Sequence, residues 1–380
     1  FRMEIGQSTD GPLMTLESAP SGFFKSVWGV SSWDMFIAGG EYDYDAMEYK
    51  GIILCSDGSE WKTVYSRANR NFNGLWGRSR SDIFAVGQSY DDEMSGGMVL
   101  HYDGAAWTLM RENLSGSLND VWGTASEVFA VGHGGTILRF DGTGWAEMDS
   151  PVDTNLSGIW GGSASDMFAV GDGGTILRSD GTRWNKMTSG TEKDLRDVWG
   201  ISGSQIYAVG DAGIVLCFDG AEWREMNSGT DVCLRSVWAN KNRNLFVAGD
   251  AGTILGFDGT EWHEMTSGTG NRLRSLWGLP GPDVFAVGDF GTILRYLPLG
   301  LELPESVSEG DGILTGQGIV RSVYAPENDL SVTLISQDDS EISVPANVFI
   351  PAGQTSVLFD LTVTDDTDRK STRLNSSHYS

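Results

Sequence analysis

IWG at residues 159–161, MFAVGDGGTIL at 167–177 and DGTRW at 180–184 form a pattern that recurs along the chain until about residue 297. Each of the last three copies begins 39 residues after the one before it. The Trp residues that begin the seven copies are Trp28, Trp76, Trp122, Trp160, Trp199, Trp238 and Trp277. A repeat of this length indicates a solenoid, a propeller or another array, and it decides the architecture.

Each copy contains four short apolar runs separated by turn residues. In the fifth copy these runs cover residues 195–199, 206–209, 213–218 and 223–226. Runs this short, rich in Val, Ile, Phe and Trp and bounded by Gly, Asp and Ser, predict β-strands, and none has the length or the period of a helix. An Asp-Gly pair at 219–220 predicts a tight hairpin. One copy is therefore predicted to be a four-stranded antiparallel meander.

The tryptophans indicate how these meanders stack. Thirteen of the 14 Trp occupy two positions of the repeat, namely the seven named above and six in the fourth run: Trp61, Trp107, Trp145, Trp184, Trp223 and Trp262. A four-stranded sheet cannot bury both of its faces alone, so it must pack against its neighbours. A large aromatic side chain at a fixed register in every copy suits the packing between propeller blades.

The two ends of the repeat region complete each other. The seventh copy lacks its fourth run, because Leu-Pro-Leu-Gly follows Tyr296 in place of the Asp-Gly hairpin. Residues 10–16 read DGPLMTL, which has the hairpin signature with Met14 at the Trp position. A closed ring needs no polar caps, whereas an open solenoid does. We therefore predict an all-β fold in which residues 1–299 form a seven-bladed β-propeller, with the strand at residues 10–17 completing the last blade.

The repeat resembles the bacterial propeller repeats of the Asp-box-like class over about residues 10–297. This resemblance implies the propeller fold and also an alternative function, that of a carbohydrate-active hydrolase of the sialidase type. Such enzymes use an arginine cluster, a Tyr nucleophile with a Glu, and an Asp acid. Copies three to seven are close to identical, whereas such a site needs residues specific to single blades. We therefore predict no catalytic residues.

The chain is strongly acidic, with 26 Lys and Arg against 52 Asp and Glu and a net charge of -26. A field of that sign repels nucleic acid and anionic membranes, and no apolar run approaches the length of a membrane helix. We therefore expect no nucleic-acid partner and no membrane insertion, and we expect a secreted or surface-displayed bacterial protein. The chain begins at Phe1 without an initiator Met or a signal peptide, which predicts a fragment or a processed form.

The three cysteines form neither a disulfide framework nor a metal-binding spacing. Cys55 and Cys217 hold the same position in blades one and five, too far apart to pair. A bridge between Cys217 and Cys233 stays open, and buried thiols in a β-sheet core are the favoured interpretation.

Two long turns interrupt the repeat in neighbouring blades. After its second run, blade one carries residues 40–50 and blade two carries residues 88–96, and both turns are predicted on the same face of the ring. Functional residues concentrate in such loops above a rigid scaffold. Tyr beside carboxylates suits a sugar or a peptide, the carboxylates alone suit Ca²⁺, and the competing interpretation is two solvated acidic loops. The candidate ligand-binding residues are Glu41, Tyr42, Asp43, Tyr44, Asp45, Tyr49, Tyr90, Asp91 and Asp92.

A second candidate site lies three residues before each inner Trp. Four of these seven positions, in contiguous blades, are basic and form what we call the basic arc: Lys25, Arg196, Arg235 and Arg274. An arc of cations near the channel mouth suits an anionic ligand. The competing interpretation is structural, because the three Arg blades also carry an acid after the Gly that ends the second run: Asp211, Asp250 and Asp289. We favour structural Arg–Asp pairs, and unpaired arginines would instead support the hydrolase.

The composition changes at residues 298–300, beyond which no Trp occurs, and strands are predicted at 301–303, 312–323, 330–336, 342–350 and 356–364. The segments VSEGDG at 307–312, IPAGQTS at 350–356 and VTDDTD at 363–368 resemble a Calx-beta-type immunoglobulin-like sandwich, and residues 300–368 are too few to complete one. In that family acidic residues at one end of the sandwich bind Ca²⁺ through their oxygens. The resemblance implies metal ligands at Glu309, Asp311, Asp365, Asp366 and Asp368.

The last residues, 369–380, turn basic and polar without a pattern, so we expect an unstructured, non-native tail read through from a vector or adapter. For the whole chain we predict a non-catalytic extracellular or cell-surface binding or adhesion protein. Its ligand, a protein or a glycan, would contact the propeller face that carries the long turns of blades one and two. We expect no cofactor other than Ca²⁺, and the oligomeric state stays open.

Overall fold

The computed structural model describes residues 2–6, 13–15, 20–31, 34–57, 60–90, 96–240, 245–279, 284–296, 299–304, 306–308, 311–322, 329–336, 341–364, 371–373 and 375–376. Within these ranges strands dominate, and no helix is long and apolar enough to cross a bilayer. The chain divides into two compact units. One is Thr15–Arg295, and the other combines Phe1–Met14 with Tyr296–Ser380.

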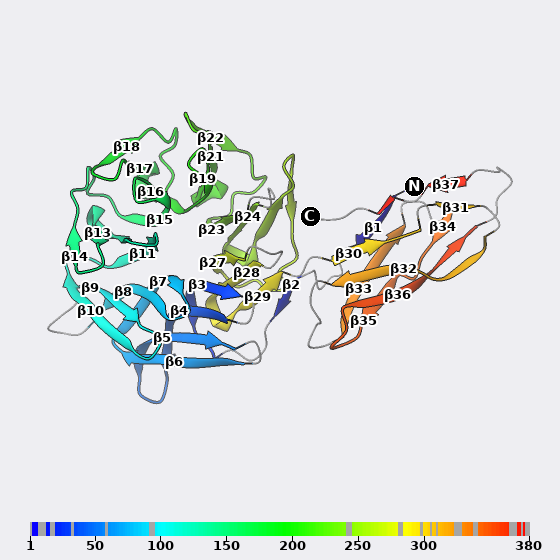
Figure 1. Ribbon diagram of the computed structural model, residues 1–380, viewed down its shortest axis with the longest axis horizontal. Helices are drawn as coiled ribbons and strands as arrows, with labels where there is room; N and C mark the ends of the chain where they lie inside the picture. The colour runs from blue at the N-terminus through cyan, green and yellow to red at the C-terminus, as the bar shows by residue number, and fades with distance from the viewer. Residues whose placement is uncertain are drawn as a thin grey trace. The chain divides into compact units, whose positions relative to one another are not determined.

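Seven four-stranded sheets surround a common centre and form the blades of a β-propeller (Figure 1). In six blades, four consecutive strands pair as an antiparallel meander with the first strand innermost. The seventh sheet has the order β2-β29-β28-β27, so the N-terminal strand β2 is the outer strand of the last blade. The predicted all-β propeller of seven blades and its closure by an N-terminal strand are therefore confirmed.

Each blade runs from an inner strand at the centre of the ring to an outer strand at its rim, and its strands follow in that order. Blade one has β3 (Phe23–Ser31), β4 (Asp34–Asp43), β5 (Glu48–Ser56) and β6 (Trp61–Ala68), and blade two has β7 (Arg70–Ser79), β8 (Asp82–Ser89), β9 (Gly96–Tyr102) and β10 (Trp107–Leu114). Blade three has β11 (Leu118–Gly123), β12 (Val128–Gly132), β13 (Ile137–Phe140) and β14 (Trp145–Glu147), and blade four has β15 (Leu156–Ser163), β16 (Asp166–Gly171), β17 (Thr175–Ser179) and β18 (Trp184–Met187). Blade five has β19 (Leu195–Ser202), β20 (Gln205–Gly210), β21 (Val215–Phe218) and β22 (Trp223–Met226), and blade six has β23 (Leu234–Ala239), β24 (Leu245–Gly249), β25 (Ile254–Phe257) and β26 (Trp262–Glu264). Blade seven has β27 (Leu273–Gly278), β28 (Val284–Gly288), β29 (Ile293–Tyr296) and β2 (Leu13–Thr15).

Side chains of one inner strand hold the inner strand of the next blade. The donor of each bond is the backbone N–H of the residue just before an inner Trp. The acceptor is a side-chain oxygen of the preceding blade, on the residue two places before that blade's own inner Trp. Three serines act in this way: the N···Oγ distances are 3.0 Å for Leu75 and Ser26, 3.0 Å for Leu276 and Ser236, and 3.3 Å for Val27 and Ser275. The last of these bonds joins blade seven to blade one and so continues the pattern across the closure of the ring.

Two blades have Gly74 and Gly158 at this position and offer no side chain. In each case the next blade carries an Asp at this position. One oxygen of its carboxylate accepts the backbone N–H that a serine of the preceding blade would otherwise bind, and the other oxygen accepts the corresponding N–H of the blade that follows. The N···O distances to Asp120 are 2.8 Å from Val121 and 2.9 Å from Ile159, and those to Asp197 are 2.7 Å from Val198 and 2.9 Å from Val237. A Cβ at Gly74 would lie 2.9 Å from the Cα of Asp120, so glycine admits the carboxylate. All seven of these inner N–H groups thus have an acceptor, as buried backbone donors require.

The inner tryptophans fill the centre of the ring. Trp122, Trp199 and Trp277 come from blades three, five and seven, yet their rings contact one another, with centroids 5.2, 5.5 and 6.5 Å apart. Each donates its indole N–H to a backbone carbonyl of the next blade, at 2.9, 2.8 and 3.0 Å respectively. The buried Trp residues of the other four blades flank this indole trio. Aromatic rings from non-adjacent blades therefore meet at the propeller axis.

Blades three to seven make the turn from their second to their third strand with a three-residue 3₁₀ segment: η1 (His133–Gly135), η2 (Asp172–Gly174), η3 (Asp211–Gly213), η4 (Asp250–Gly252) and η5 (Asp289–Gly291). The middle residue of each is left-handed, with φ between 53° and 62°. The glycine after it is left-handed as well, with φ between 66° and 73°. Glycine at the last position of each turn adopts this conformation without steric cost.

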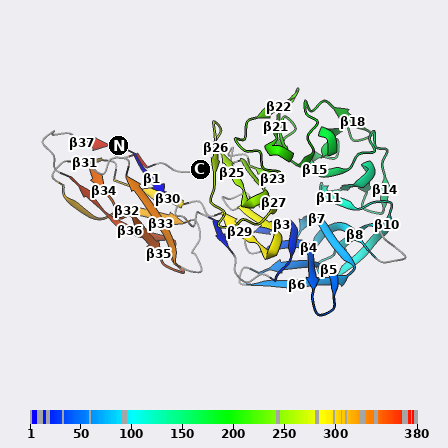
Figure 2. The ribbon, with the colours of Figure 1, turned by 180° about the vertical axis from the view of Figure 1, so that it is seen from behind.

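The second unit contains two four-stranded sheets (Figure 2). One has the order β30 (Leu299–Glu302), β32 (Ile313–Ser322), β36 (Ser356–Val363) and β34 (Ile342–Ser343), and the other has β35 (Asn347–Ile350), β33 (Leu330–Ser336), β1 (Arg2–Gly6) and β38 (Asn375–Ser376). Buried side chains of both sheets, such as Val320 and Val332, form one apolar cluster. The predicted strand at 342–350 is instead two strands, β34 and β35, in different sheets, and an immunoglobulin-like strand order stays a prediction.

Two boundaries differ from the predicted ones. Strand β1 pairs antiparallel with β33 from Met3 opposite Ser336 to Gly6 opposite Thr333, so residues 2–6 belong to the second unit and not to the propeller. The segment expected to be an unstructured tail contains β37 (Ser371–Arg373), which pairs with β31 (Ser306–Ser308), and β38, which pairs with β1. Backbone pairing at sheet edges depends on free N–H and C=O groups and leaves little trace in side-chain pattern.

Candidate binding face

The connections between second and third strands all emerge at one end of the propeller, because the strands of every meander alternate in direction. We call this end the turn face. It carries the connection between β4 and β5, the one between β8 and β9, the five 3₁₀ turns and the basic arc. The prediction that the long turns of blades one and two share a face follows from the observed topology.

The three arginines of the basic arc are paired with the predicted acids. The guanidinium of Arg196 donates to both oxygens of Asp211, at 2.9 and 2.7 Å, and lowers the pKa of that carboxyl. Arg235 pairs in the same bidentate way with Asp250, and Arg274 pairs with Asp289 at 2.5 and 3.2 Å. The favoured interpretation of structural pairs is therefore correct. The role of Arg196, Arg235 and Arg274 as ligands for an anion stays a prediction, with part of each guanidinium already bound to its Asp.

Lys25, the fourth member of the basic arc, has a different environment. Its blade carries Gly40 where the three Arg blades carry an Asp. The Lys25 ammonium donates to Asn73 Oδ1 at 2.8 Å and has no ion pair among the residues described by the structure. Burial lowers the pKa of Lys25 to about 8, the charge of Arg274 lowers it further, and the charge of Asp289 opposes the shift.

Charge is unevenly distributed along the arc. Arg196 lies near three acids, since its guanidinium nitrogens are 2.7 Å from Asp211, 3.1 Å from Asp194 and 3.8 Å from Asp172. In blades six, seven and one the balance is reversed, because Arg235 and Arg272 share Asp250 while Arg272 and Arg274 share Asp289. With Lys25, four cations there face two carboxylates. The connection at residues 41–50 of blade one, on the same face, adds four acids against one lysine, so the excess of cations is confined to the side chains around Asp250, Asp289 and Lys25.

The long turn of blade one is a hairpin and not a loop. Strands β4 and β5 stay paired from Gly40 opposite Gly51 to Asp43 opposite Glu48, leaving only residues 44–47 as the turn. We call residues 41–50 the blade-one hairpin. Asp43 Oδ1 accepts the backbone N–H groups of Asp45 and Ala46, both at 2.9 Å, and Oδ2 accepts from Lys50 Nζ at 2.5 Å. The Lys50 bond is the main reason that the pKa of Asp43 is lowered. Asp43 therefore shapes the turn and is not a free ligand.

The tyrosines of the blade-one hairpin form a cluster. The Tyr42 ring contacts Tyr44 and Tyr49 edge-on, with centroids 4.9 and 5.0 Å apart, and its hydroxyl lies 3.9 Å from Met47 Sδ. Tyr44, Met47 and Tyr49 are exposed by 81, 71 and 53%. Glu41 and Asp45 also belong to this hairpin, opposite Lys50 in the ladder and in the turn respectively. The hairpin thus presents apolar surface to solvent at its turn and on the strand that follows it.

Blade two contributes less that can be described. Tyr90 is exposed, and its N–H donates to Asn69 O at 2.9 Å. Asp91 and Asp92 lie outside the described residues, so their predicted role is untested.

Blade seven adds an aromatic residue that the prediction did not include. Phe290 occupies the left-handed position of η5, with φ 57°, where the other four 3₁₀ turns have Gly or Ala. Its side chain is 71% exposed and contacts Phe23 of blade one at a centroid distance of 5.6 Å. We call Phe23 and Phe290 the aromatic corner. A bulky side chain at positive φ is a strained conformation, and such strain concentrates at functional sites. Aligning the seven copies position by position would have revealed Phe290.

Most of the predicted Ca²⁺ ligands lie outside the described residues, namely Glu309, Asp365, Asp366 and Asp368. Asp311 is described: its Oδ2 accepts the Ser308 N–H at 2.7 Å, and its own N–H donates to Ser308 O at 3.0 Å. The contacts of Asp311 are those of a local turn, and its role as a metal ligand is untested.

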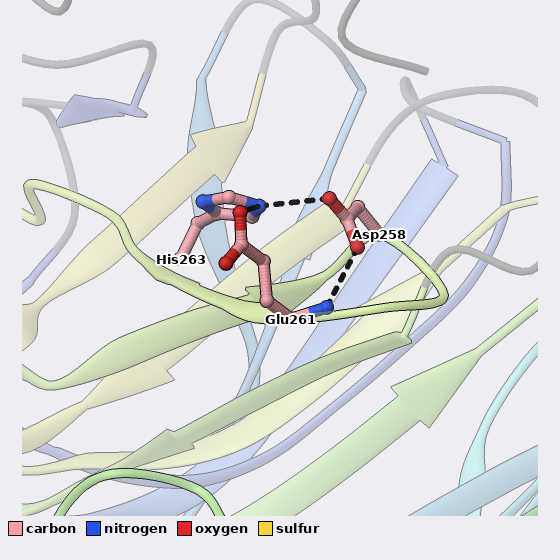
Figure 3. Close-up of side chains that lie close together, drawn as sticks. All are labelled: Asp258, Glu261 and His263. Carbon is pink, nitrogen blue, oxygen red and sulfur yellow. Dashed lines mark hydrogen bonds and ion pairs between the residues drawn. The ribbon is translucent and has the colours of Figure 1, made fainter.

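One further group of side chains could hold a metal by distance alone. Asp258, Glu261 and His263 lie together on the outer hairpin of blade six (Figure 3). His263 Nε2 is 2.9 Å from Asp258 Oδ2, while Asp258 Oδ1 accepts the backbone N–H groups of Thr260 and Glu261. The same Asp-Gly turn in blade three gives Asp141 two backbone bonds, and there it needs no ion. The group is explained by the hairpin turn.

All three cysteines are free thiols. Burial raises the pKa of each, that of Cys233 to about 11 with a further contribution from its bond to Asp211. The open alternative of a bridge between Cys217 and Cys233 is not formed, and the three thiols are half-buried and not fully buried as expected.

Comparison with known proteins supports the fold. No family model matches the sequence, and no curated protein matches it either. Among solved structures, "YCF48 bound to D1 peptide" matches with a TM-score of 0.61 and 15% identity over 77% of this chain and 97% of that one. YCF48 from Cyanidioschyzon merolae matches with a TM-score of 0.57 and 13% identity over 75 and 98%. The WD40 β-propeller domain of Doa1 matches with a TM-score of 0.58 and 11% identity over 77 and 96%. At such identities these likenesses establish a β-propeller, and membership of the Asp-box-like and Calx-beta classes stays a prediction.

Proposed function

We propose that this protein is a non-catalytic binding module that takes a protein segment on the turn face of its propeller, against the blade-one hairpin. The observation that carries the proposal is the exposure of Tyr44 and Met47 in the turn of this hairpin and of Tyr49 on the strand that leaves it. Tyr and Met are enriched in the cores of protein interfaces, where aromatic anchors contribute much of the affinity. Side chains held on a scaffold that is already ordered lose little entropy on binding.

Two further observations support a protein ligand over a glycan. One of the acids that were expected to grip a sugar, Asp43, is engaged within the hairpin by Lys50 and by two backbone N–H groups. One of the similar propeller structures is described as bound to a peptide, which shows that a comparable ring accommodates one. The composition supports a secreted or cell-surface location and an adhesive role as parts of the same proposal.

The hydrolase alternative has no observation in its favour. Its arginine cluster would be Arg196, Arg235 and Arg274, and each of these pairs with its own Asp. Each guanidinium therefore already uses at least two N–H groups on a neighbouring carboxylate, so the three arginines do not form an unpaired cluster.

We expect that changing both Tyr44 and Tyr49 to Ser weakens binding at least tenfold, about 1.4 kcal/mol, because the exposed anchors are lost. The measurement is binding of the purified protein to a peptide array and to a glycan array. Leu109→Ser is the matched control, since Leu109 is an exposed apolar residue of the outer strand β10 away from the hairpin. Equal binding by the double variant and the wild type would refute the proposal, and binding to glycans alone would replace its ligand class.

Ca²⁺ binding by the second unit is also a proposal, supported by the acidic segments at 307–312 and 363–368. Titration calorimetry with Ca²⁺ should give heat that disappears when Asp365, Asp366 and Asp368 are changed to Asn. If the wild-type chain gives no heat with Ca²⁺, the proposal of a Ca²⁺ site in the second unit is wrong.

A further inference from the structure

Lys25 and Arg274 belong to the two blades that meet at the aromatic corner. Phe23 and Lys25 alternate on β3, and Phe290 directly follows Asp289, the acid that Arg272 and Arg274 share. The η5 turn is held against the start of blade one by the bond from Gly291 N–H to Gly22 O at 2.8 Å. The exposed Phe290, the half-buried Phe23 and an ammonium without a carboxylate thus belong to two neighbouring blades, with the Lys25 ammonium directed toward Asn73 of blade two.

We propose that this junction binds a peptide carboxylate that is flanked by a bulky apolar side chain, with Lys25 receiving the carboxylate and Phe23 and Phe290 receiving the apolar group. The inference rests on the proposed function and names the chemistry of the segment bound. Charge complementarity selects the occupant, because four cations there share two carboxylates and a ligand carboxylate would reduce the imbalance. A hydrogen bond between an ammonium and a carboxylate is stronger than one between neutral groups. The bond from Lys25 to the ligand carboxylate would form beside partly buried surface.

An acidic sugar is the weaker occupant. A sugar site needs many free hydrogen-bonding side chains, but here Asn73 donates to Ser117 and Leu118 and accepts from Lys25. The Phe rings carry no hydroxyl and meet at 56°, which makes a corner for an aliphatic or aromatic side chain and not a flat platform. The strain at Phe290 is also informative. Gly or Ala serves the same turn position in four other blades, so a large exposed side chain at φ 57° is not required by the turn.

The test uses the full chain and an array of hexapeptides in which Phe or Leu adjoins a carboxylate. One arm carries the carboxylate at a free C-terminus, a second carries the same peptides amidated, and a third carries an internal Asp or Glu in amidated peptides. The first and third arms distinguish a chain end from an acidic side chain as the source. Acidic glycans on a parallel array form a fourth arm. Affinities of the best peptides are then measured by fluorescence anisotropy.

We expect Lys25→Gln and Phe290→Gly each to weaken binding at least tenfold. Lys193→Gln is the matched control: Lys193 is an exposed lysine near the η3 turn of the same face, and its removal should leave binding within twofold. The melting temperature of Phe290→Gly should be no lower than that of the wild type, because glycine relieves the left-handed strain, so any lost binding is not lost folding.

The outcomes separate this inference from the proposed function. If peptides bind and the double Tyr variant loses them while Lys25→Gln and Phe290→Gly keep them, the turn face binds protein but this junction does not receive the carboxylate. If amidated peptides without an acid bind as well as acidic ones, the carboxylate is not recognised and the inference fails. Binding of acidic glycans without peptides, or of no peptide at all, rejects both proposals.

Discussion

Changing Trp199 to Ala should lower the free energy of unfolding of the propeller by about 3 kcal/mol, the lower end of the range for deleting a core aromatic side chain, because Trp199 is partly and not fully buried. Trp199 contacts Trp122 and Trp277 edge-on at 5.2 and 5.5 Å and donates its indole N–H to Ala239 O at 2.8 Å. Its removal leaves a void where three non-adjacent blades meet, and no neighbour can close it without shifting a strand. For a unit of this size each kcal/mol corresponds to roughly 2–4 °C, so thermal unfolding should begin roughly 10 °C earlier.

Trp199→Phe is the informative companion variant. It keeps a ring in the trio and loses the N–H donor, so we expect a loss of about 1 kcal/mol, the value of one hydrogen bond. Urea unfolding followed by tryptophan fluorescence or circular dichroism measures both. If Trp199→Ala costs less than about 1 kcal/mol, the three rings do not pack the axis as a unit, and the centre of the ring is held by the inner strands alone.

The trio also bears on where ligands bind. Rings from blades three, five and seven meet across the centre, so a ligand that entered along the axis would encounter indoles and not a polar channel. The exposed Tyr44, Met47, Tyr49 and Phe290 are on the turn face, towards blades seven and one. The packed centre and these exposed anchors together favour a peripheral site over an axial one.

The spacing of the repeated residues predicted the blades, the closing strand and the Arg–Asp pairs, because each of these depends on a residue that recurs at a fixed position in the repeat. Trp and Gly-Asp-x-Gly set strand register and turn geometry locally, and pairs such as Arg196 with Asp211 vary together among the blades. The contacts across blades were not anticipated in this way. Gly74 of blade two offers no side-chain acceptor, and Asp120 of blade three supplies one in its place. This relation is visible only when the residues two places before each inner Trp are compared around the ring.

The blade-one hairpin shows a different limit of the sequence. Extra residues in a repeat predict an insertion, but whether an insertion pairs as strands depends on backbone bonds between residues such as Glu41 and Lys50. The acids looked like free ligands because charge is visible in a sequence and turn bonds are not. Asp43 illustrates this, since its two oxygens are used by Lys50 and by the turn itself. The pairing of strand β1 with β33 of the second unit likewise depends on backbone hydrogen bonds.

A marked pH dependence of stability is the second large effect that we expect, and it comes from the two inner aspartates. Burial raises the pKa of Asp120 to about 8, with a further rise from the charge of Asp197, while the bonds from the Ile159 and Val121 N–H groups oppose it. Burial likewise raises the pKa of Asp197 to about 6, against the bonds from Val237, Ser236 and Val198. In the unfolded chain the pKa of both groups returns to its ordinary value of 3.8.

The sign follows from proton counting. Between pH 3.8 and the raised values the native state holds protons that the unfolded chain has released, so stability falls as the pH rises. Both groups contribute up to about pH 6, and Asp120 alone contributes from there to about pH 8. Each contributes a slope of about 1 kcal/mol per pH unit within its window. The loss of stability caused by ionisation of these two groups is absent below about pH 4 and reaches its full size above about pH 8.

Asp120→Asn tests this assignment through the slope and not through absolute stability, because an amide accepts only one of the two N–H bonds and costs something at every pH. Urea unfolding of the wild type and the variant from about pH 5 to 8.5 should show that the variant loses most of the decline between about pH 6 and 8. Asp180→Asn is the control: Asp180 is an exposed turn residue whose pKa is lowered to about 2 mainly by the Thr182 hydroxyl, so its removal should leave the slope above about pH 5 unchanged. Parallel pH profiles for the wild type and Asp120→Asn would mean that Asp120 titrates normally and that the ring of inner N–H acceptors carries a full charge at neutral pH.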